Sequence, residues 1–209
     1  MHKSKSSNFH SKTNLGREVE PKLPNDLLID LHDLEYSIER PIGQGAFGSV
    51  YKARLKSRNK EVALKIYHLD IVNSNSSKRL LQNVVKELTS LDHENIIKCF
   101  GLCLEKMGIV LELAEKTIML DSQPVTVHSL RQLINVVGDD GEIPDWLILD
   151  AMFQITKGLE YLHNSKVNHG DLKSANVLVS GKVDTEYSFI LADFGQPQSA
   201  ITSLQGIFY

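Results

Sequence analysis

Residues 169–178 read His-Gly-Asp-Leu-Lys-Ser-Ala-Asn-Val-Leu, and this stretch brings polar side chains with complementary chemistry close together in the chain. Asp171 can accept the proton of a hydroxyl nucleophile, and Lys173 can screen the charge of a phosphoryl group in transfer. Asn176 supplies an amide oxygen, which is a hard ligand suited to Mg²⁺. The stretch therefore predicts a catalytic loop with a base, a cation and a metal ligand.

A second carboxylate follows the loop, in the turn Ala192-Asp193-Phe194-Gly195. Asp193 lies on a glycine-flanked turn and is the natural main ligand for magnesium. An isolated Asp-Phe-Gly triplet carries little information. Its position after the loop at 169–178 makes the pair of motifs specific.

A glycine-rich stretch lies near the other end of the chain, where residues 42–50 read Ile-Gly-Gln-Gly-Ala-Phe-Gly-Ser-Val. Glycine lets the backbone fold closely over an anion and present its N–H groups. The same spacing also opens dinucleotide-binding folds, but there a helix starts at the third glycine. Here the strand-like residues 49–53 follow, so we predict the tip of a hairpin. An ordinary glycine hairpin is the alternative.

Lys65 ends the apolar run Val62-Ala63-Leu64 on the next predicted strand. An ammonium group that rises from an apolar strand is costly unless an anion meets it. The phosphates of ATP would meet this need. A lysine on a solvated strand face is the alternative, and the glycine loop that precedes Lys65 makes that alternative weaker.

The periodicity of the apolar residues predicts strands first and helices second, which indicates an α+β fold in two lobes. The predicted strands are 36–42, 48–55, 61–67, 96–102, 108–113, 177–179 and 188–192, and the predicted helices are 76–91 and 145–162. The buried stripe expected for the second helix is Ile148, Met152, Ile155, Leu159 and Leu162. We expect a flexible polar tail over 1–33, a β-rich lobe over 34–114 and a helical part over 115–209. The segment 116–127 alternates apolar and polar residues and indicates no function.

Composition restricts the class of protein. The chain has 209 residues and a net charge of −3, a balance that argues against a nucleic-acid partner held by electrostatics. No signal peptide and no membrane-spanning segment is predicted. Cys99 and Cys103 show no metal-ligand or disulfide pattern, so we expect a reducing compartment, the cytoplasm or the nucleus. The sequence does not indicate an oligomeric state.

The order of these motifs resembles the eukaryotic protein kinase family over residues 34–209. The resemblance implies ATP, Mg²⁺ and a protein substrate, with Asp171 as the catalytic base and Lys173 and Lys65 as catalytic cations. It implies Asn176 and Asp193 as the metal ligands. Leu111 would be the gatekeeper, and residues 112–114 the hinge whose backbone binds adenine. The residues implied to line the nucleotide site are Ile42, Gly43, Gly45, Gly48, Val50, Ala63, Lys65, Leu111, Glu112, Ala114 and Leu178.

Lys173 also bears on the substrate class, because a lysine two positions after the catalytic aspartate resembles kinases specific for serine and threonine. The string Asp-Leu-Lys-Ser-x-Asn further resembles the tyrosine-kinase-like group, whose members are mostly specific for serine and threonine. A small-molecule kinase of the same fold is a weaker alternative.

Three departures from the family pattern bear on activity. Kinases carry a glutamate nine positions before His93, where this chain has Val84, and the nearest acid is Glu87. Gly170 replaces the usual arginine, which suggests that phosphorylation of the activation segment is not the switch. Residues 203–209 resemble the stretch before the Ala-Pro-Glu motif, so we expect an incomplete helical lobe with exposed apolar surface. A pseudokinase-like binding module is therefore the alternative to an enzyme.

Overall fold

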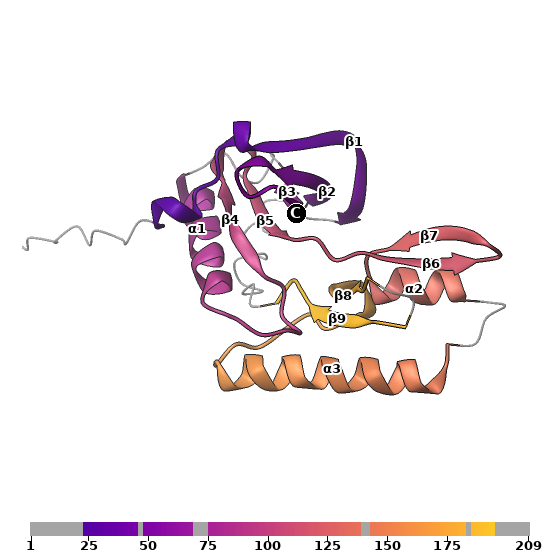
Figure 1. Cartoon of the computed structure of the whole chain (residues 1–209). Helices are drawn as coiled ribbons and strands as arrows, with labels where there is room; N and C mark the ends of the chain where they lie inside the picture. The colour runs from indigo at the N-terminus through magenta and orange to yellow at the C-terminus, as the bar shows by residue number, and fades with distance from the viewer. Residues whose placement is uncertain (1–22, 46–47, 69–74, 139–142, 183–184, 195–209) are drawn as a thin grey trace, which may run out of the picture.

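The computed structural model describes residues 23–45, 48–68, 75–138, 143–182 and 185–194. A five-stranded antiparallel sheet, in the order β1-β2-β3-β5-β4, forms the upper part of the molecule (Figure 1). Its strands are β1 (Leu34–Gly45), β2 (Gly48–Leu55), β3 (Lys60–Tyr67), β4 (Cys99–Cys103) and β5 (Gly108–Glu112). The helix α1 (Asn75–Thr89) packs beside β4.

The remaining elements lie below the sheet in the view of Figure 1. They are the hairpin of β6 (Lys116–Leu120) and β7 (Gln123–Val127), the helices α2 (Leu130–Val137) and α3 (Asp145–Asn164), and the hairpin of β8 (Val177–Ser180) and β9 (Ser188–Leu191). Helix α3 packs against β9, and α2 packs against β8. Short 3-10 turns lie at Asn25–Leu27, Leu31–Asp33, Lys56–Arg58, Leu104–Lys106 and Ser174–Asn176. None of the helices within the described ranges has the length and apolarity needed to cross a membrane.

Each face of the five-stranded sheet carries an apolar cluster. One face presents Val62, Leu64 and Val110, all fully buried. The opposite face presents Ile109, which packs with α1 residues such as Val85. Because Lys65 is paired with Ile109 in the register of β3 and β5, the lysine lies on the face that α1 covers. A third cluster joins α2 and α3 to the β8–β9 hairpin.

The ordered structure begins earlier than the predicted boundary at Leu34. Leu23 and Ile29 are buried, and the Ile29 backbone N–H donates to the Leu102 carbonyl of β4 at 2.9 Å. Gly101 makes this approach possible, because a Cβ there would lie 2.4 Å from the Leu27 carbonyl oxygen. A tail over 1–33 is therefore wrong for residues 23–33, and the part over 1–22 lies outside the described residues.

The segment 116–127 forms the β6–β7 hairpin, which the sequence pattern alone did not predict. Asp121 and Ser122 both have positive φ, at 48° and 65°, as a tight two-residue hairpin turn requires. The buried side of the hairpin, at Val127, joins the core cluster of the helical part. Helix α2 follows directly, capped by the Ser129 side chain, which accepts from the Gln132 N–H at 3.3 Å.

The predicted buried stripe of α3 is partly wrong. Ile148 is 44% exposed and Met152 is 60% exposed, whereas Leu147, Ala151 and Leu162 are buried. The N-terminal half of α3 carries apolar residues on more than one side, so the periodicity fits two stripes equally well. Contact with β9 selects the stripe that contains Leu147 and Ala151.

Candidate functional site

One face of the sheet gathers the residues predicted for the nucleotide site. Val50 pairs with Lys65 across β2 and β3, and Ala63 pairs with Leu111 across β3 and β5. Directly paired residues of an antiparallel sheet share a face, so these four side chains point the same way. Gly43 pairs with Val50 and extends this face to β1.

The three glycines of the β1–β2 hairpin differ in how closely other residues approach them. A Cβ at Gly48 would lie 2.3 Å from the Ile66 carbonyl oxygen, so only glycine lets β2 approach β3 this closely. At Gly43 a Cβ would make ordinary contacts of 3.7 Å with Val50, and at Gly45 it would come no closer than 4.0 Å to the Gly48 carbonyl oxygen. Internal packing therefore requires Gly48 and leaves room beside the other two. The hairpin tip at 46–47 lies outside the described residues.

Lys65 forms an ion pair with Asp193, which follows β9. This contact joins the sheet to the opposite part of the molecule. Burial opposes the charge on the lysine, but Tyr67 and Asp193 outweigh this effect and hold the pKa of the Lys65 ammonium above its ordinary value. Asp193 has a φ of 58°, a left-handed conformation that aspartate tolerates better than most residues.

Asp171 is held by two donors in the predicted catalytic loop. The Lys173 ammonium lies 2.6 Å from Asp171 Oδ2, and the Asn176 amide donates to the same oxygen at 3.0 Å. The hydrogen bond from Lys173, followed by that from Asn176, keeps the pKa of the Asp171 carboxyl below its ordinary value. Asp171 is therefore ionised at neutral pH, as a base must be.

His169 packs inside the loop region, although the sequence indicated no role for it. The imidazole is buried, and its ring centroid lies 5.9 Å from that of the buried Phe194 in an edge-on arrangement. Its Nδ1 accepts from the Asp171 N–H at 3.4 Å, and burial lowers the pKa of His169. The neutral ring thus connects Asp171, the predicted base, with the turn that carries Asp193.

A backbone hydrogen bond ties the two predicted metal ligands to each other. The Ala192 N–H donates to the Asn176 carbonyl at 2.9 Å. Since the Asn176 amide nitrogen is occupied by Asp171, the side-chain oxygen is the atom left for a metal. An amide oxygen and a carboxylate suit Mg²⁺, which prefers oxygen ligands and completes its shell with phosphate and water. The residues present therefore fit this ion. Gly195 lies outside the described residues.

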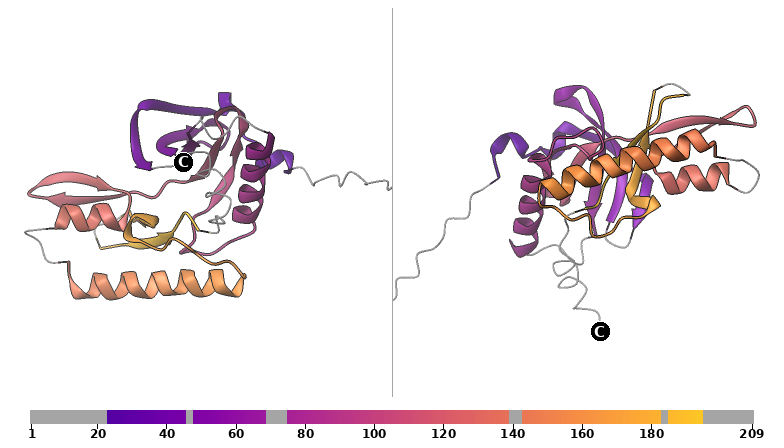
Figure 2. Two further views of the ribbon diagram at one scale, coloured as in Figure 1. Left: turned by 180° about the vertical axis from the view of Figure 1, so that it is seen from behind. Right: turned by 90° about the horizontal axis from the view of Figure 1, so that it is seen from below.

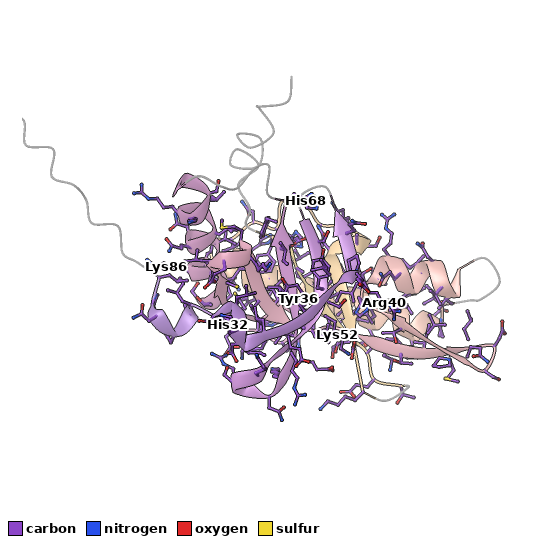
Figure 3. The ribbon with its side chains drawn as sticks, turned by 90° about the horizontal axis from the view of Figure 1, so that it is seen from above. His32, Tyr36, Arg40, Lys52, His68 and Lys86 are labelled. Atoms are coloured by element: carbon purple, nitrogen blue, oxygen red, sulfur yellow. The ribbon has the colours of Figure 1, made fainter. Side chains whose placement is uncertain are left out.

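The segment between β5 and β6 is held from both sides. The Ala114 carbonyl lies 2.9 Å from His128 Nδ1, in a hydrogen bond that the imidazole donates. The Lys52 ammonium, labelled in Figure 3, lies 3.1 Å from both carboxylate oxygens of Glu115 and 3.2 Å from Glu61. Lys52 belongs to β2, so its contact with Glu115 connects the sheet to the predicted hinge.

Glu112 offers only its backbone to the nucleotide face. Its carboxylate accepts from the Lys98 N–H at 2.7 Å, and its own N–H donates to the Lys98 carbonyl at 2.9 Å. Alternation along β5 places the Glu112 side chain on the face opposite to Leu111. On the other side of the site, Leu178 of β8 packs against the same core cluster as Leu111. Ile42 and Val50 are half-buried.

Helix α1 supplies no acidic partner for Lys65 among the described residues. Val84 is half-buried in the cluster between α1 and the sheet. Glu87 is exposed, and the ion pair of Lys65 is made with Asp193 instead. The structure thus has the apolar Val84 facing the sheet where the family pattern has a glutamate.

The sequence indicated no role for two further residues of this region, His128 and Lys116. His128 and Ala114 meet only through the fold, and nothing in their sequence spacing indicated the contact. Lys116 is 1% exposed, and its ammonium lies 4.5 Å from the centre of the Tyr187 ring. The alternation of apolar and polar residues over 116–127 could have indicated that Lys116 is buried. In a strand pair this alternation puts Lys116 on the same side as the apolar Val127, with which it is paired.

The motifs and the geometry agree with comparisons to known proteins. Residues 36–204 match the model of the protein kinase domain. The chain is 31% identical over 163 residues to a probable serine/threonine-protein kinase of Dictyostelium discoideum, a match that covers 77% of this chain and 29% of that protein. It is 30% identical over 161 residues to a serine/threonine-protein kinase of Gibberella zeae, with 77% of this chain and 29% of that protein covered.

A third relative, the probable serine/threonine-protein kinase roco9 of Dictyostelium discoideum, is 33% identical over 178 residues, which cover 81% of this chain and 5% of that protein. The matches therefore span less than a third of the length of these curated relatives. The family model, by contrast, matches most of the present chain. The chain belongs to the protein kinase domain family.

Proposed function

We propose that this chain binds ATP with Mg²⁺ between the sheet and the β8–β9 hairpin and transfers the γ-phosphoryl group to a serine or threonine of a protein substrate. The Lys65–Asp193 ion pair carries the proposal. It joins the strand lysine to the carboxylate after β9, and the backbone bond between Ala192 and Asn176 extends this contact to Asp171. The family's chemistry needs these groups together.

The nucleotide would lie against the face that carries Val50, Ala63 and Leu111, with Leu178 on its other side. The backbone of Gly43 and Gly45 has room to approach the phosphates, because even a Cβ at these positions would come no closer than 3.7 Å to another residue. Ala114 would offer its N–H to adenine while His128 holds its carbonyl. Lys65 would bind the α- and β-phosphates through its ammonium group.

The catalytic loop would perform the proton transfer. Asp171 accepts the proton of the attacking hydroxyl, and its lowered pKa keeps it ready at neutral pH. Lys173, 2.6 Å from Asp171, is placed to screen charge near the transferred group. Asn176 and Asp193 would hold Mg²⁺, which neutralises phosphate charge when bound.

Thermal unfolding of the 209-residue chain with and without ATP and Mg²⁺ tests the binding step. Ligand at 100 times its Kd stabilises a protein by about 2.7 kcal/mol, so the melting temperature should rise by several degrees. Lys65→Met and Asp193→Asn should abolish the rise. A cooperative transition that ATP leaves unchanged would contradict the proposal.

Transfer of phosphate is a separate measurement. Labelled γ-phosphate should pass to a serine-containing protein such as casein, and Asp171→Asn should reduce the rate by at least about 100-fold. The same variant should still show the ATP-dependent rise in melting temperature, because Asp171 does not bind the nucleotide in this proposal. Equal rates for the variant and the parent chain would contradict the role of Asp171.

A second candidate function is a nucleotide-binding regulatory module that transfers no phosphate. The half-buried Val84 supports it, because α1 offers Lys65 no acid to orient the ammonium. An ATP-dependent rise in melting temperature without phosphate transfer would favour this candidate.

Glu87 allows a direct test of whether α1 contributes to nucleotide binding. Since Glu87 is exposed and Lys65 pairs with Asp193, Glu87→Gln should leave the Kd for ATP unchanged within about twofold, which corresponds to about 0.4 kcal/mol. Asp193→Asn is the matched carboxylate-to-amide control and should weaken Mg²⁺-dependent binding strongly. A large loss of affinity in Glu87→Gln would show that α1 shifts when nucleotide binds.

The proposal includes two lobes, with residues 34–114 as the smaller lobe and the residues from 115 onward as the larger one. It also places the protein in the cytoplasm or the nucleus. The two cysteines support such a reducing compartment, because Cys99 and Cys103 are buried free thiols. Burial raises the pKa of both thiols to about 11, so neither is a reactive thiolate at neutral pH.

A further inference from the structure

Arg131 lies at the edge of the catalytic loop and takes no part in the machinery described above. It is an exposed residue in the first turn of α2, and its Nε–H donates to Ser174 Oγ at 3.2 Å. Ser174 follows Lys173 and opens the 3-10 turn that ends at Asn176. Figure 1 shows α2 beside β8, the strand that continues from this turn. The guanidinium group is thus fixed to the loop that carries Asp171.

The terminal nitrogens of Arg131 have no acidic partner within the part of the chain that the structure describes. The ion pairs found there join other residues. The bond to Ser174 uses only Nε–H, which leaves the terminal N–H groups of the fork for a ligand. This fork matches a carboxylate or a phosphate with two parallel hydrogen bonds.

Stability of α2 does not explain a cation at this position. The first turn of a helix favours negative charge, and a positive charge there is unfavourable. The helix is capped by Ser129, not by Arg131. Lys173, the other cation of the loop, is already paired with Asp171 at 2.6 Å. Arg131 is therefore a positive group at this edge of the loop that, within the described ranges, is open to an incoming anion.

We propose that Arg131 recognises an acidic or phosphorylated side chain of the protein substrate, close in sequence to the hydroxyl that accepts phosphate. This proposal rests on the proposed kinase function. Asp171 and Ser174 are three positions apart, a distance of at most about 11 Å along an extended chain. The anion would therefore lie within about four residues of the acceptor in an extended substrate.

Peptide binding tests the proposal without requiring catalysis. Fluorescence anisotropy would compare serine peptides that carry glutamate, phosphoserine, alanine or arginine at each position flanking the acceptor, with the whole 209-residue chain. At one flanking position, the glutamate and phosphoserine peptides should bind at least about tenfold more tightly than the alanine peptide, as expected for a charge-assisted hydrogen bond. Comparison of the glutamate peptide with the phosphoserine peptide shows whether the site prefers acidic or phosphorylated substrates.

Variants assign the preference to the guanidinium group. Arg131→Ala should remove the preference for anionic peptides, and Arg131→Glu should replace it with a preference for the arginine peptide. Ser174→Ala keeps the charge of Arg131 but loses the hydrogen bond, so it should weaken the preference. Arg54→Ala is the matched control, because Arg54 is exposed on β2 and bonds Asn59 away from the loop. The control should retain the full preference, and circular dichroism should show that all variants are folded.

Parallel phosphate-transfer assays distinguish this proposal from the kinase function. An Arg131-dependent preference without any transfer would support the anion site and contradict the enzyme. Transfer that is indifferent to the flanking residue would support the enzyme and overturn the anion site. Failure of every peptide to bind, or a preference that survives Arg131→Glu, would also overturn it.

Discussion

At the scale of single residues, the charges around Asp171 determine how the proposed base titrates. Two donors, Lys173 and Asn176, meet at one carboxylate oxygen. Each favours the ionised form, so protonation of Asp171 requires a lower pH than an isolated aspartate would. We therefore expect the rate of phosphate transfer to be maintained in mildly acidic solution.

Lys173→Met should move the acid limb of the pH–rate profile to higher pH. The rate depends on ionised Asp171 and falls as the pH drops through its pKa, and loss of the Lys173 cation raises that pKa. We expect kcat to fall by about 100-fold as well, because charge near the transferred group is lost. The profile of kcat against pH measures both effects, and an NMR titration of the Asp171 carboxyl group measures the pKa without catalysis. Lys86→Met, at an exposed residue of α1 (Figure 3), is the control and should change neither.

Gly170 shows how backbone conformation restricts the same loop. Its φ is 77°, and a Cβ at this position would meet no atom within 4 Å. Space is therefore available for a side chain, but the left-handed backbone is unfavourable for residues other than glycine. The arginine that most kinases carry here would be accommodated at a conformational cost.

Gly170→Ala should lower the free energy of unfolding by about 1 kcal/mol, the cost of placing alanine in a left-handed conformation. Gly170→Asn should lower the free energy of unfolding by less, because asparagine tolerates the left-handed conformation. Urea denaturation measures both differences. An alanine variant as stable as the parent chain would show that the loop adopts another backbone conformation in solution.

At the scale of elements, the β1–β2 hairpin combines a packing requirement with a binding surface. The register pairs Gly45 with Gly48 and Gly43 with Val50. Among Gly43, Gly45 and Gly48, it is Gly48 that meets a neighbouring strand so closely that a methyl group would collide with backbone. The three glycines of the motif are therefore not equivalent.

Gly48→Ala should destabilise the fold by about 1–3 kcal/mol, because β2 and β3 must separate to admit the Cβ. Gly45→Ala is the matched control and should change the free energy of unfolding by less than about 0.5 kcal/mol. Thermal and urea denaturation in the absence of nucleotide measure these effects. Equal losses for the two variants would contradict the packing role of Gly48.

At the scale of the whole molecule, α3 joins the core by one side and leaves its other side open within the described structure. Figure 2 shows α3 at the edge of the molecule, with β9 on one side of it. The exposed large apolar residues of this helix are Trp146, Ile148, Leu149, Met152 and Phe153. Such a group of side chains is typical of an interaction or aggregation surface.

Leu149→Lys should reduce self-association and binding of hydrophobic dyes without loss of stability, because Leu149 is 66% exposed. Leu147→Ala, two positions earlier, should instead cost about 2–5 kcal/mol, since Leu147 is buried against the core. Sedimentation velocity measures association, and urea denaturation measures stability. If the Leu149→Lys variant unfolds, this face of α3 must be buried in the core, contrary to the prediction.

The sequence alone predicted the fold class and most strand positions, and it named the residues proposed for the site. Short motifs such as Asp171-Leu172-Lys173 and Asp193-Phe194-Gly195 carry this information because the chemistry needs particular residue types at particular spacings. Strand and helix periods likewise follow from local geometry, so β2 was predicted with the bounds that the structure shows. Local rules suffice for such features.

Only the tertiary structure decided which residues meet across elements. The pairing of Lys65 with Asp193, the contact of His128 with Ala114 and the choice of the buried stripe of α3 all depend on packing between distant segments. Residues 23–33 are ordered for the same reason, since their apolar side chains are buried against the sheet. A local pattern reports the shape of one segment, whereas long-range burial and charge pairing exist only once the segments have come together.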